Sequence, residues 1–423
     1  MAEGVRHLLT RGARVLRRQG PRAVARKAVT VTAQRWGAGN ELTLHEHLVA
    51  DSTELQLRWP THPAAADQPL TIGWICTPPT LGSGGHTTMF RMVEGLERAG
   101  HRCRLYLYDR HDGDLEAQRR TVREGWPGVR AEVLSSDALP GGSRPTGGRP
   151  LDACIATSWE SAHVLATLGA APMQRFYFVQ DYEPYFYPRG TEYALAEDSY
   201  RFGFHVLALG SMVADCLRSQ LGVPSTVVDF GSDTTTYFVK SPPAERTGVV
   251  CYARPGNPRR GWAMAELSLT RFHRRHPDVP IRIYGAHLRN LPFPAEIYPR
   301  LTPAELNDLY NRSVAGLALS FTNVSLVAEE MLSAGVVPVV NDAPEPRACL
   351  TNPSVVWAAG TPSALADALG ATVSSGATLD RRATASSPTR GSWATTAGQV
   401  VEAVEHHCFA RLQEPVHAPA GAS

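Results

Sequence analysis

One segment of the sequence has residue types that suit the binding of a nucleotide. A strand-like run is followed by a polar turn and an expected helix, which together contain Thr322, Asn323, Ser325 and Glu330. Unpaired backbone amides at a helix start favour an anion such as phosphate. A carboxylate on the same helix can accept hydrogen bonds from the hydroxyl groups of a ribose. The pattern therefore predicts a nucleotide site, and the alternative is that Glu330 is an exposed helix residue.

Two other segments could contact the phosphates of such a ligand. Gly84 and Gly85, just before an expected helix, would let the backbone approach a phosphate closely, although a tight turn explains them equally well. Arg254 and Arg260 follow an expected strand and could form bidentate hydrogen bonds with a diphosphate. The alternative is a solvated basic turn. The dinucleotide fingerprint GxGxxG is missing here, which argues against an NAD(P)-dependent enzyme.

Residues 178–188, FVQDYEPYFYP, combine carboxylates with aromatic rings at the end of an expected strand. Flat rings pack on the apolar faces of sugars, and carboxylates bond to sugar hydroxyls. Asp181, Tyr182 and Glu183 are therefore candidate contacts to a carbohydrate. The alternative is an aromatic surface loop packed on its own domain, but exposed aromatic rings are costly unless a ligand covers them.

Strand-like and helix-like segments alternate twice along the chain, before and after a break at Lys240–Arg246. This predicts two facing Rossmann-like, doubly wound α/β domains with parallel sheets, whose ligands bind at the carboxyl ends of the strands. The cleft between the domains is the expected site. Strands are expected at residues 70–76, 102–109, 152–157, 176–180, 206–209, 226–229, 248–253, 281–284, 315–319 and 336–340, and helices at 87–99, 263–276, 303–311, 325–334 and 392–408.

Composition fits this organisation. The chain has 423 residues, 43% hydrophobic and 19% charged, which is enough for two ordinary domains. A net charge of +2 gives no reason to expect nucleic acid as a partner. The cysteines are scattered without a CxxC pair, which argues against a zinc knuckle and is typical of a reducing compartment. Without a membrane-spanning run or a secretory leader, the protein is expected to be cytoplasmic.

The expected domain boundaries follow composition. Residues 1–69 form a basic arm and linker, 70–240 the first domain, 241–390 the second domain, and 391–412 a helix that returns toward the first domain. The arm is rich in arginine and has Glu3 as its lone acidic residue within residues 1–40. It is interpreted as a loosely docked helix, and the alternative is an interfacial helix on anionic lipid at the inner face of the membrane. Residues 141–150 and 371–390 are expected to be loose surface segments.

Several segments, in order, resemble glycosyltransferase family 4, a family of retaining enzymes with the GT-B fold. The family's EAMACGTPVV-type signature is similar to EEMLSAGVVPVV at residues 329–340. Its glycine loop, GR…KG segment, pre-motif helix and C-terminal helix are similar to residues 83–109, 253–261, 301–320 and 392–404. With FVQDYEPYFYP and YGAH, the combination is most similar to the WsaF-like rhamnosyltransferases that build bacterial surface glycans, over about residues 70–410.

The resemblance implies a nucleotide-diphosphate sugar as donor and a glycan or lipid-linked acceptor, with neither a cofactor nor a metal. Arg254 and Arg260 would neutralise the leaving diphosphate and Asp181 would lie near the reacting sugar, so these three are the expected catalytic residues. The acceptor would contact His86, Tyr182 and Glu183 in the first domain. The donor would contact Gly84, Gly85, Arg254, Arg260, Tyr284, Thr322, Asn323, Ser325 and Glu330.

The sequence departs from the family pattern in three places. Thr322 stands where the first of two paired glutamates is expected, Arg260 replaces a lysine, and an extra residue precedes Pro338. Loss of the first glutamate would suit a 6-deoxy sugar. The expected reaction is transfer of a hexosyl unit, such as L-rhamnosyl from dTDP-L-rhamnose, to a bacterial surface polysaccharide. The alternative is a catalytically silent protein of the same fold that binds a nucleotide-sugar or a glycan.

Overall fold

A computed structural model describes residues 42–140, 150–241, 245–323, 326–375, 380–385 and 391–409. The chain divides into a small unit that ends at Val49 and a large unit that begins at Ala50. Within the small unit, the described residues contain the short helix η1, Glu46–Leu48. The basic arm expected at residues 1–40 lies outside the described residues, as do residues 141–149 of the loop expected at 141–150.

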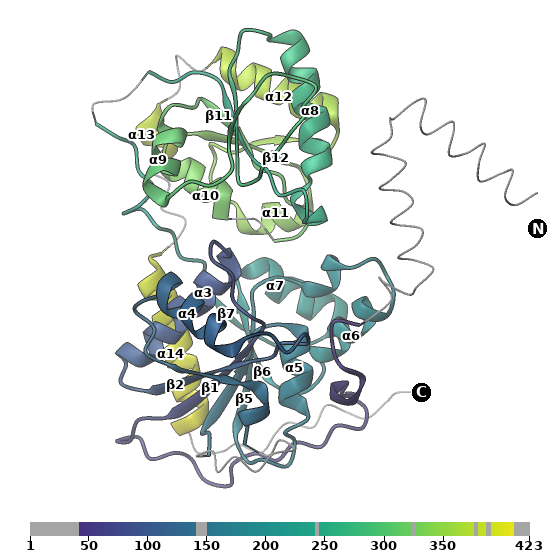
Figure 1. Cartoon of the computed structure of the whole chain (residues 1–423), viewed down its shortest axis with the longest axis vertical. Coiled ribbons are helices and arrows are strands. Elements are labelled where there is room, and N and C mark those ends of the chain that lie inside the picture. The colour runs from purple at the N-terminus through teal and green to yellow at the C-terminus, as the bar shows by residue number, and fades with distance from the viewer. Residues whose placement is uncertain are drawn as a thin grey trace, which may run out of the picture. The chain divides into compact units, whose positions relative to one another are not determined.

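The large unit contains two parallel sheets with helices packed against them (Figure 1). The first sheet has the strand order β3-β2-β1-β4-β5-β6-β7, so the chain reverses its direction of winding between β1 and β4. Such a switch point opens a crevice at the carboxyl ends of the strands. The strands are β1 Thr71–Cys76, β2 Arg102–Leu107, β3 Glu132–Ser135, β4 Ala153–Ala156, β5 Gln174–Val179, β6 His205–Leu209 and β7 Thr226–Val228.

The helices of the first domain start with well-formed caps. Ser83 caps α3 by accepting a hydrogen bond from the His86 amide, and Ser158 forms a capping box with Ser161 at the start of α5. These caps fix the loops that follow β1 and β4. The helices are α3 Gly84–Arg98, α4 Leu115–Gly125, α5 Trp159–Ala166, α6 Thr191–Ser199 and α7 Ser211–Cys216, with the short helices η2 Ser136–Ala138, η3 Glu183–Phe186 and η4 Leu217–Leu221.

The second sheet repeats the same winding, with the order β10-β9-β8-β11-β12-β13 and a switch point between β8 and β11. Its strands are β8 Val249–Tyr252, β9 Ile281–Tyr284, β10 Glu296–Tyr298, β11 Ala315–Leu317, β12 Val337–Asn341 and β13 Val356–Ala358. Its helices are η5 Pro258–Arg260, α8 Trp262–Arg275, α9 Pro303–Asn311, α10 Leu326–Ser333, α11 Pro344–Cys349, α12 Pro362–Ser374 and α13 Arg381–Ala385. Both crevices are therefore built in the same way.

The last helix, α14 Trp393–Phe409, packs against α3 (Figure 1). Ala397, Val400 and Val404 of α14 are buried in the core of the first domain. A Cβ added at Gly95 of α3 would lie 2.6 Å from the Cβ of Ala397, so the two helices approach closely only because residue 95 is glycine. This contact ties the end of the chain to the helix that begins at the glycine loop.

The structure confirms two parallel-sheet α/β domains, and each expected strand is present within a few residues. The sequence reading missed the edge strands β3, β10 and β13. It was wrong for part of residues 371–390, because α12 continues to Ser374 and α13 spans Arg381–Ala385. Burial of Leu365, Leu369 and Thr372 holds α12 in place. In the described part of the chain, no helix is both long enough and apolar enough to span a bilayer.

Candidate functional site

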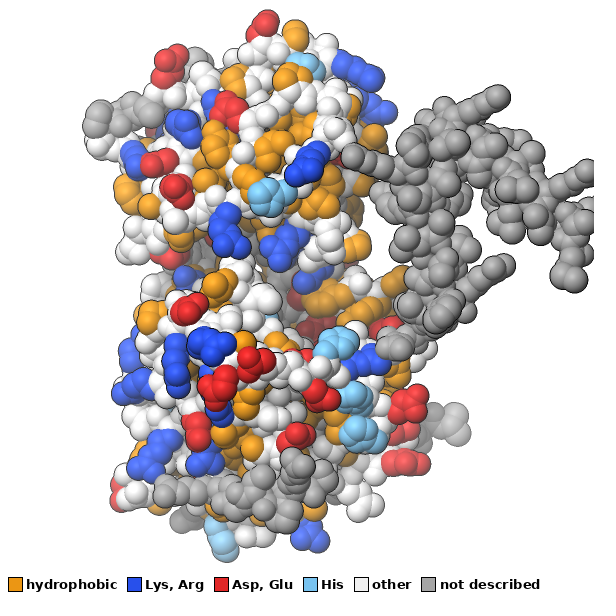
Figure 2. Space-filling view, in the orientation of Figure 1, with side chains coloured by type: hydrophobic (Ala, Val, Ile, Leu, Met, Phe, Trp, Pro, Cys, Tyr) orange, Lys and Arg blue, Asp and Glu red, His pale blue; other side chains and the backbone are white. Residues whose placement is uncertain are grey.

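A cavity of about 560 Å³ lies where strands of both sheets end, a size that suits a nucleotide-sugar. The first domain contributes the loops after β1, β4 and β5, and the second contributes the loops after β8 and β11 and the last residue of β9. On the face shown in Figure 2 the surface is hollowed between the two domains, with basic side chains along the edge of the second. The lining includes Gly84, Gly85, His86, Gln180, Asp181, Glu183, Tyr252, Arg254, Arg260, Tyr284, Asn323 and Glu330.

The glycine loop faces open space. A Cβ added at Gly84 would meet nothing within 4 Å, and one at Gly85 would come no closer than 3.7 Å to the Gln180 side chain. Packing within the protein therefore leaves room in front of both glycines. His86 is held by its own loop, because its Nε2 lies 3.3 Å from the Thr77 carbonyl and its Nδ1 lies 2.9 Å from the Ser83 hydroxyl. Burial lowers the pKa of His86 and so favours the neutral ring.

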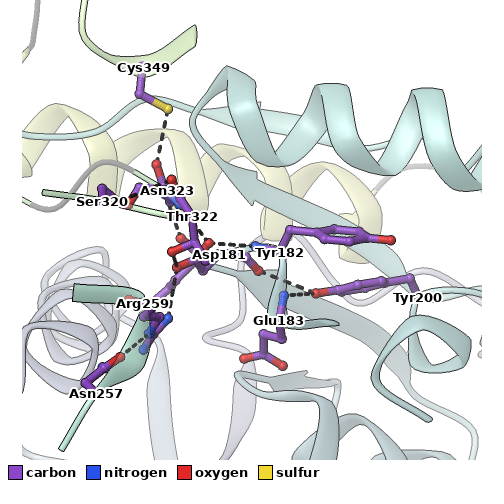
Figure 3. A network of polar contacts seen from close by, with 11 residues as sticks. Asp181, Tyr182, Glu183, Tyr200, Asn257, Arg259, Ser320, Thr322, Asn323 and Cys349 are labelled. Carbon is purple, nitrogen blue, oxygen red and sulfur yellow. Dashed lines mark hydrogen bonds and ion pairs between the residues drawn. The ribbon is translucent and has the colours of Figure 1, made fainter. Parts of the chain in front are cut away.

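Asp181 is fully engaged by protein donors (Figure 3). Its Oδ2 accepts from Arg259 Nη1 at 2.9 Å and from the Thr322 hydroxyl at 2.9 Å. Its Oδ1 accepts from the amides of Tyr182 at 2.9 Å and Asn323 at 3.1 Å. A carboxylate with four donors has little capacity left to take a proton from a substrate. The structure therefore places Asp181 at the cavity wall, where it joins the loops after β5, β8 and β11.

The loop that carries Thr322 and Asn323 is fixed by further bonds. Asn323 Nδ2 donates to the Gln180 carbonyl at 2.9 Å, and the Ser320 hydroxyl donates to the Asn323 carbonyl at 2.6 Å. The Cys349 thiol lies 3.1 Å from Asn323 Oδ1 (Figure 3). Thr322 is 1% exposed and does not line the cavity, whereas Asn323 does. Ser325, also expected to contact the donor, lies outside the described residues.

Three arginines follow β8, and the structure separates their roles. Arg259 is committed to Asp181, and its guanidinium lies 3.6 Å from the centre of the Phe186 ring. Arg260 lines the cavity, and its Nη1 is buried without a hydrogen-bond partner among the described residues. Burial, with the nearby Arg259 charge, lowers the pKa of Arg260. Arg254 is exposed at the cavity, 3.5 Å from the Tyr252 hydroxyl.

A buried N–H group without an acceptor is costly, and it suggests that an acceptor belongs there. Arg260 and Arg254 are the two guanidinium groups of this cavity that the protein leaves open to an anion, according to the contacts among the described residues. The sequence singled out both of them. It did not separate Arg259 from Arg260, because nothing in the local pattern shows which of two adjacent arginines meets Asp181.

Glu330 lies at the second-domain wall of the cavity, at the end of a line of hydroxyl groups. Its Oε2 accepts from the Tyr310 hydroxyl at 3.3 Å, and the Tyr310 and Tyr284 hydroxyls lie 2.6 Å apart. Burial, helped by Asp233, raises the pKa of Glu330 to about 7. Tyr284, one of the expected donor contacts, also lines the cavity. The sequence reading missed Tyr310, which lies on α9, 20 residues before Glu330.

The acceptor-side candidates separate into two environments. Glu183 lines the cavity, and its Oε2 accepts from the Trp159 amide at 2.5 Å and from the Tyr177 hydroxyl at 3.1 Å. Burial, followed by the nearby Glu160 charge, raises the pKa of Glu183 to about 8. Tyr182 is fully buried, stacks on Tyr200 and does not line the cavity. The aromatic ring of this segment that does line the cavity is Phe186.

Within the described ranges, no group of three or more His, Cys, Asp or Glu side chains is arranged to hold a metal ion. Among the described residues, the groups of the cavity that could interact with a polar ligand are its arginines, the helix starts and two carboxyl groups of raised pKa, Glu183 and Glu330. These groups can bind a ligand that combines negative charge with hydroxyl groups.

Two protein-family models match parts of this chain. The family model of the WsaF N-terminal domain matches residues 148–210, and the model of the WsaF C-terminal domain matches residues 247–370. The O-antigen biosynthesis protein RfbC of Myxococcus xanthus is 31% identical over 340 residues, which are 75% of this chain and 26% of RfbC. The chain thus spans about a quarter of the length of this curated relative.

Solved structures share the fold at low sequence identity. Anabaena HepE in complex with UDP and glucose has a TM-score of 0.57 at 14% identity, over 79% of this chain and 99% of HepE. A putative UDP-N-acetylglucosamine 2-epimerase from Listeria monocytogenes has a TM-score of 0.55 at 13% identity, over 80% of this chain and 96% of the epimerase. With the models of both WsaF domains matched in order, the chain has the two-sheet GT-B fold and is similar to the WsaF-like glycosyltransferases.

Proposed function

We propose that this chain transfers a hexosyl unit from a nucleotide-diphosphate sugar to a glycan or lipid-linked acceptor during the synthesis of a bacterial surface polysaccharide. The observation that carries the proposal is the buried Nη1 of Arg260, which lines the cavity with Arg254 and has no partner among the described residues. A diphosphate would satisfy both guanidinium groups. The likeness to RfbC, named for O-antigen biosynthesis, supports the polysaccharide context.

The proposed mechanism is electrostatic. As the bond between the anomeric carbon and the phosphate oxygen breaks, negative charge grows on the diphosphate. The acceptor hydroxyl oxygen forms the new bond to the anomeric carbon, and its proton leaves with the diphosphate. Arg254 and Arg260 stabilise that charge, which is the role that a metal ion has in other transferases. Glu330 accepts hydrogen bonds from sugar hydroxyls of the nucleotide, and Tyr310 holds its carboxyl group in place. Gly84 and Gly85, at the start of α3, line the same cavity, and the start of a helix favours negative charge.

For the donor sugar we propose a 6-deoxyhexose, with L-rhamnose from dTDP-L-rhamnose as the first choice. Thr322 is buried and donates its hydroxyl hydrogen to Asp181, so position 322 presents no carboxylate to the cavity. A 6-deoxy sugar has one hydroxyl group fewer than a hexose and needs one polar contact fewer. A protein group placed to bond that hydroxyl would be left buried without a partner when a 6-deoxy sugar binds. In the related family a glutamate stands at this position.

The first test replaces Arg254 by alanine. Turnover, measured as nucleotide-diphosphate release from dTDP-L-rhamnose in the presence of acceptor, should fall by about 100-fold or more, since one electrostatic stabiliser of a transition state is worth roughly that much. Arg271→Ala on the exposed side of α8 is the matched control and should leave turnover unchanged. Turnover of Arg254→Ala near that of the wild type, in a folded protein, would contradict the mechanism.

A second candidate is a catalytically silent protein that binds a nucleotide-sugar. Two observations favour it: Thr322 replaces a carboxylate of the family pattern, and the four donors on Asp181 leave it without capacity to act as a base. Calorimetry with dTDP-L-rhamnose and a release assay on the same sample separate the two candidates. Binding without any release of dTDP, with a panel of acceptors present, would favour the silent protein over the transferase.

A further inference from the structure

Glu183 differs from the other acidic and imidazole groups that line the cavity, because one of its carboxyl oxygens remains available to an acceptor. Asp181 has four donors on its two oxygens, and both ring nitrogens of His86 have partners within their own loop. Glu330 belongs to the second domain, where the donor contacts are proposed. Glu183 is the remaining such group among the described lining residues, and it comes from the first domain.

The two oxygens of Glu183 have different surroundings. Oε2 is fixed by the backbone amide of Trp159 at 2.5 Å and the hydroxyl of Tyr177 at 3.1 Å. Oε1 has no hydrogen bond to another described residue. The carboxyl group lies beside the start of α5, where Thr157 and Ser158 also line the cavity. Figure 3 shows the same carboxyl group turned away from the cluster around Asp181. Oε1 is therefore the atom available to a ligand.

Among the residues that the structure describes, no cation compensates a charge on Glu183. The charged groups that act on Glu183 are the carboxyl groups of Glu160 on α5 and Asp181 on the loop after β5, and its other titratable neighbours are tyrosines: Tyr177, Tyr187 and Tyr200. Within the described ranges no arginine, lysine or histidine forms an ion pair with it. Burying an unpaired carboxylate next to other carboxylates is costly, so the neutral acid is favoured. The pKa of Glu183, raised by burial to about 8, agrees with this.

We propose that Glu183 acts as a neutral carboxylic acid that recognises the acceptor, donating a hydrogen bond from Oε1–H to a hydroxyl oxygen of the acceptor sugar. The proton is placed on Oε1 because Oε2 already accepts two hydrogen bonds. A carboxylic acid kept neutral by its surroundings is an established type of hydrogen-bond donor in enzyme sites. This inference rests on the proposed transfer to a glycan. It makes Glu183 a specificity-determining contact, with no part in taking the proton of the acceptor.

The protonation state can be measured without any ligand. Full-length protein labelled with ¹³C at the glutamate carboxyl groups is titrated from pH 6 to 9.5, and the infrared difference between the wild type and Glu183→Gln isolates the Glu183 signal. The carbonyl band of a protonated carboxyl group should be present at pH 7 and should disappear as the pH rises through about 8. A carboxylate band already present at pH 7 would overturn the proposal.

The second measurement is calorimetric binding of octyl α-L-rhamnopyranoside, a probe acceptor, in the presence of dTDP. Glu183→Gln keeps a neutral N–H donor and a carbonyl acceptor at the same length, so it should retain most of the affinity. Glu183→Met has the same length without polar atoms and should lose about tenfold, the worth of one unmade hydrogen bond. Above pH 8 the wild type should weaken and Glu183→Gln should not. Glu124→Gln, at an exposed position of α4, is the control.

Equal losses in Glu183→Gln and Glu183→Met would show that the charged form is needed, and that result would overturn the proposal. So would a wild type without measurable affinity for the rhamnoside. Failure of the proposed function appears separately, as an absence of dTDP release from dTDP-L-rhamnose by the wild type with acceptor present. The infrared result does not depend on that assay.

Discussion

The charged side chains of the cavity form two groups. Some are paired with other side chains of the protein, and others remain open to a ligand. Arg259 and Asp181 satisfy one another across 78 positions of sequence, whereas Arg254 and Arg260 face the cavity. The sequence could identify the arginines, the glycines and Glu330 as candidates, because local motifs carry them. It could not reveal which arginine meets Asp181, or that the Tyr310 hydroxyl supports Glu330, because both contacts depend on the tertiary fold.

Glu330 gives a pH-dependent prediction. Its pKa, raised by burial to about 7, means that the carboxyl group is largely protonated at pH 6 and charged at pH 8. Hydroxyl groups of the nucleotide donate to the charged form more strongly, so affinity for dTDP-L-rhamnose should increase by up to about tenfold over this range. Calorimetry in matched buffers measures this affinity at each pH. The diphosphate diester of the ligand does not titrate between pH 6 and 8, so the change reports on the protein. Glu330→Gln should show a flat profile, and a wild-type affinity unchanged from pH 6 to 8 would refute the role.

At the scale of elements, the loops after β5, β8 and β11 are joined by the four donors around Asp181. The positions of the buried apolar strands at the centre of each sheet were predictable from the sequence. The strands missed by the sequence, β3, β10 and β13, have three or four residues and lie at sheet edges. Edge strands bury little surface and therefore lack the continuous apolar run of central strands. Single-sequence periodicity has little to detect there.

Asp181→Asn tests this junction. The amide lacks the negative charge that meets Arg259 and has one acceptor oxygen in place of two, so buried donors lose their partner at a cost of about 1–3 kcal/mol. The expected result is a lower thermal midpoint together with faster hydrogen exchange at the amides of Tyr182 and Asn323. Asp215→Asn, which breaks an exposed ion pair with Arg218, is the control and should have little effect. Unchanged exchange at Asn323 would show that the junction does not hold the loops.

At the scale of the whole molecule, both sheets wind in the same order and bring their carboxyl ends to one cavity, while α14 returns to the core of the first domain. This arrangement was predictable from two successive alternating blocks, because doubly wound sheets place ligands at their switch points. The network around Asp181 was not predictable, because its partners lie on separate loops of both domains.

The proposed mechanism depends above all on the binding of a diphosphate between Arg254 and Arg260. The most direct measurement is a calorimetric titration of dTDP into the wild type and into the double variant Arg254→Ala/Arg260→Met, each with its fold checked by circular dichroism. We predict clear binding by the wild type and a loss of about 100-fold or more in the double variant, because two charge-assisted contacts of about 1.5–3 kcal/mol each are removed. Equal affinity of the two proteins for dTDP would contradict the claim.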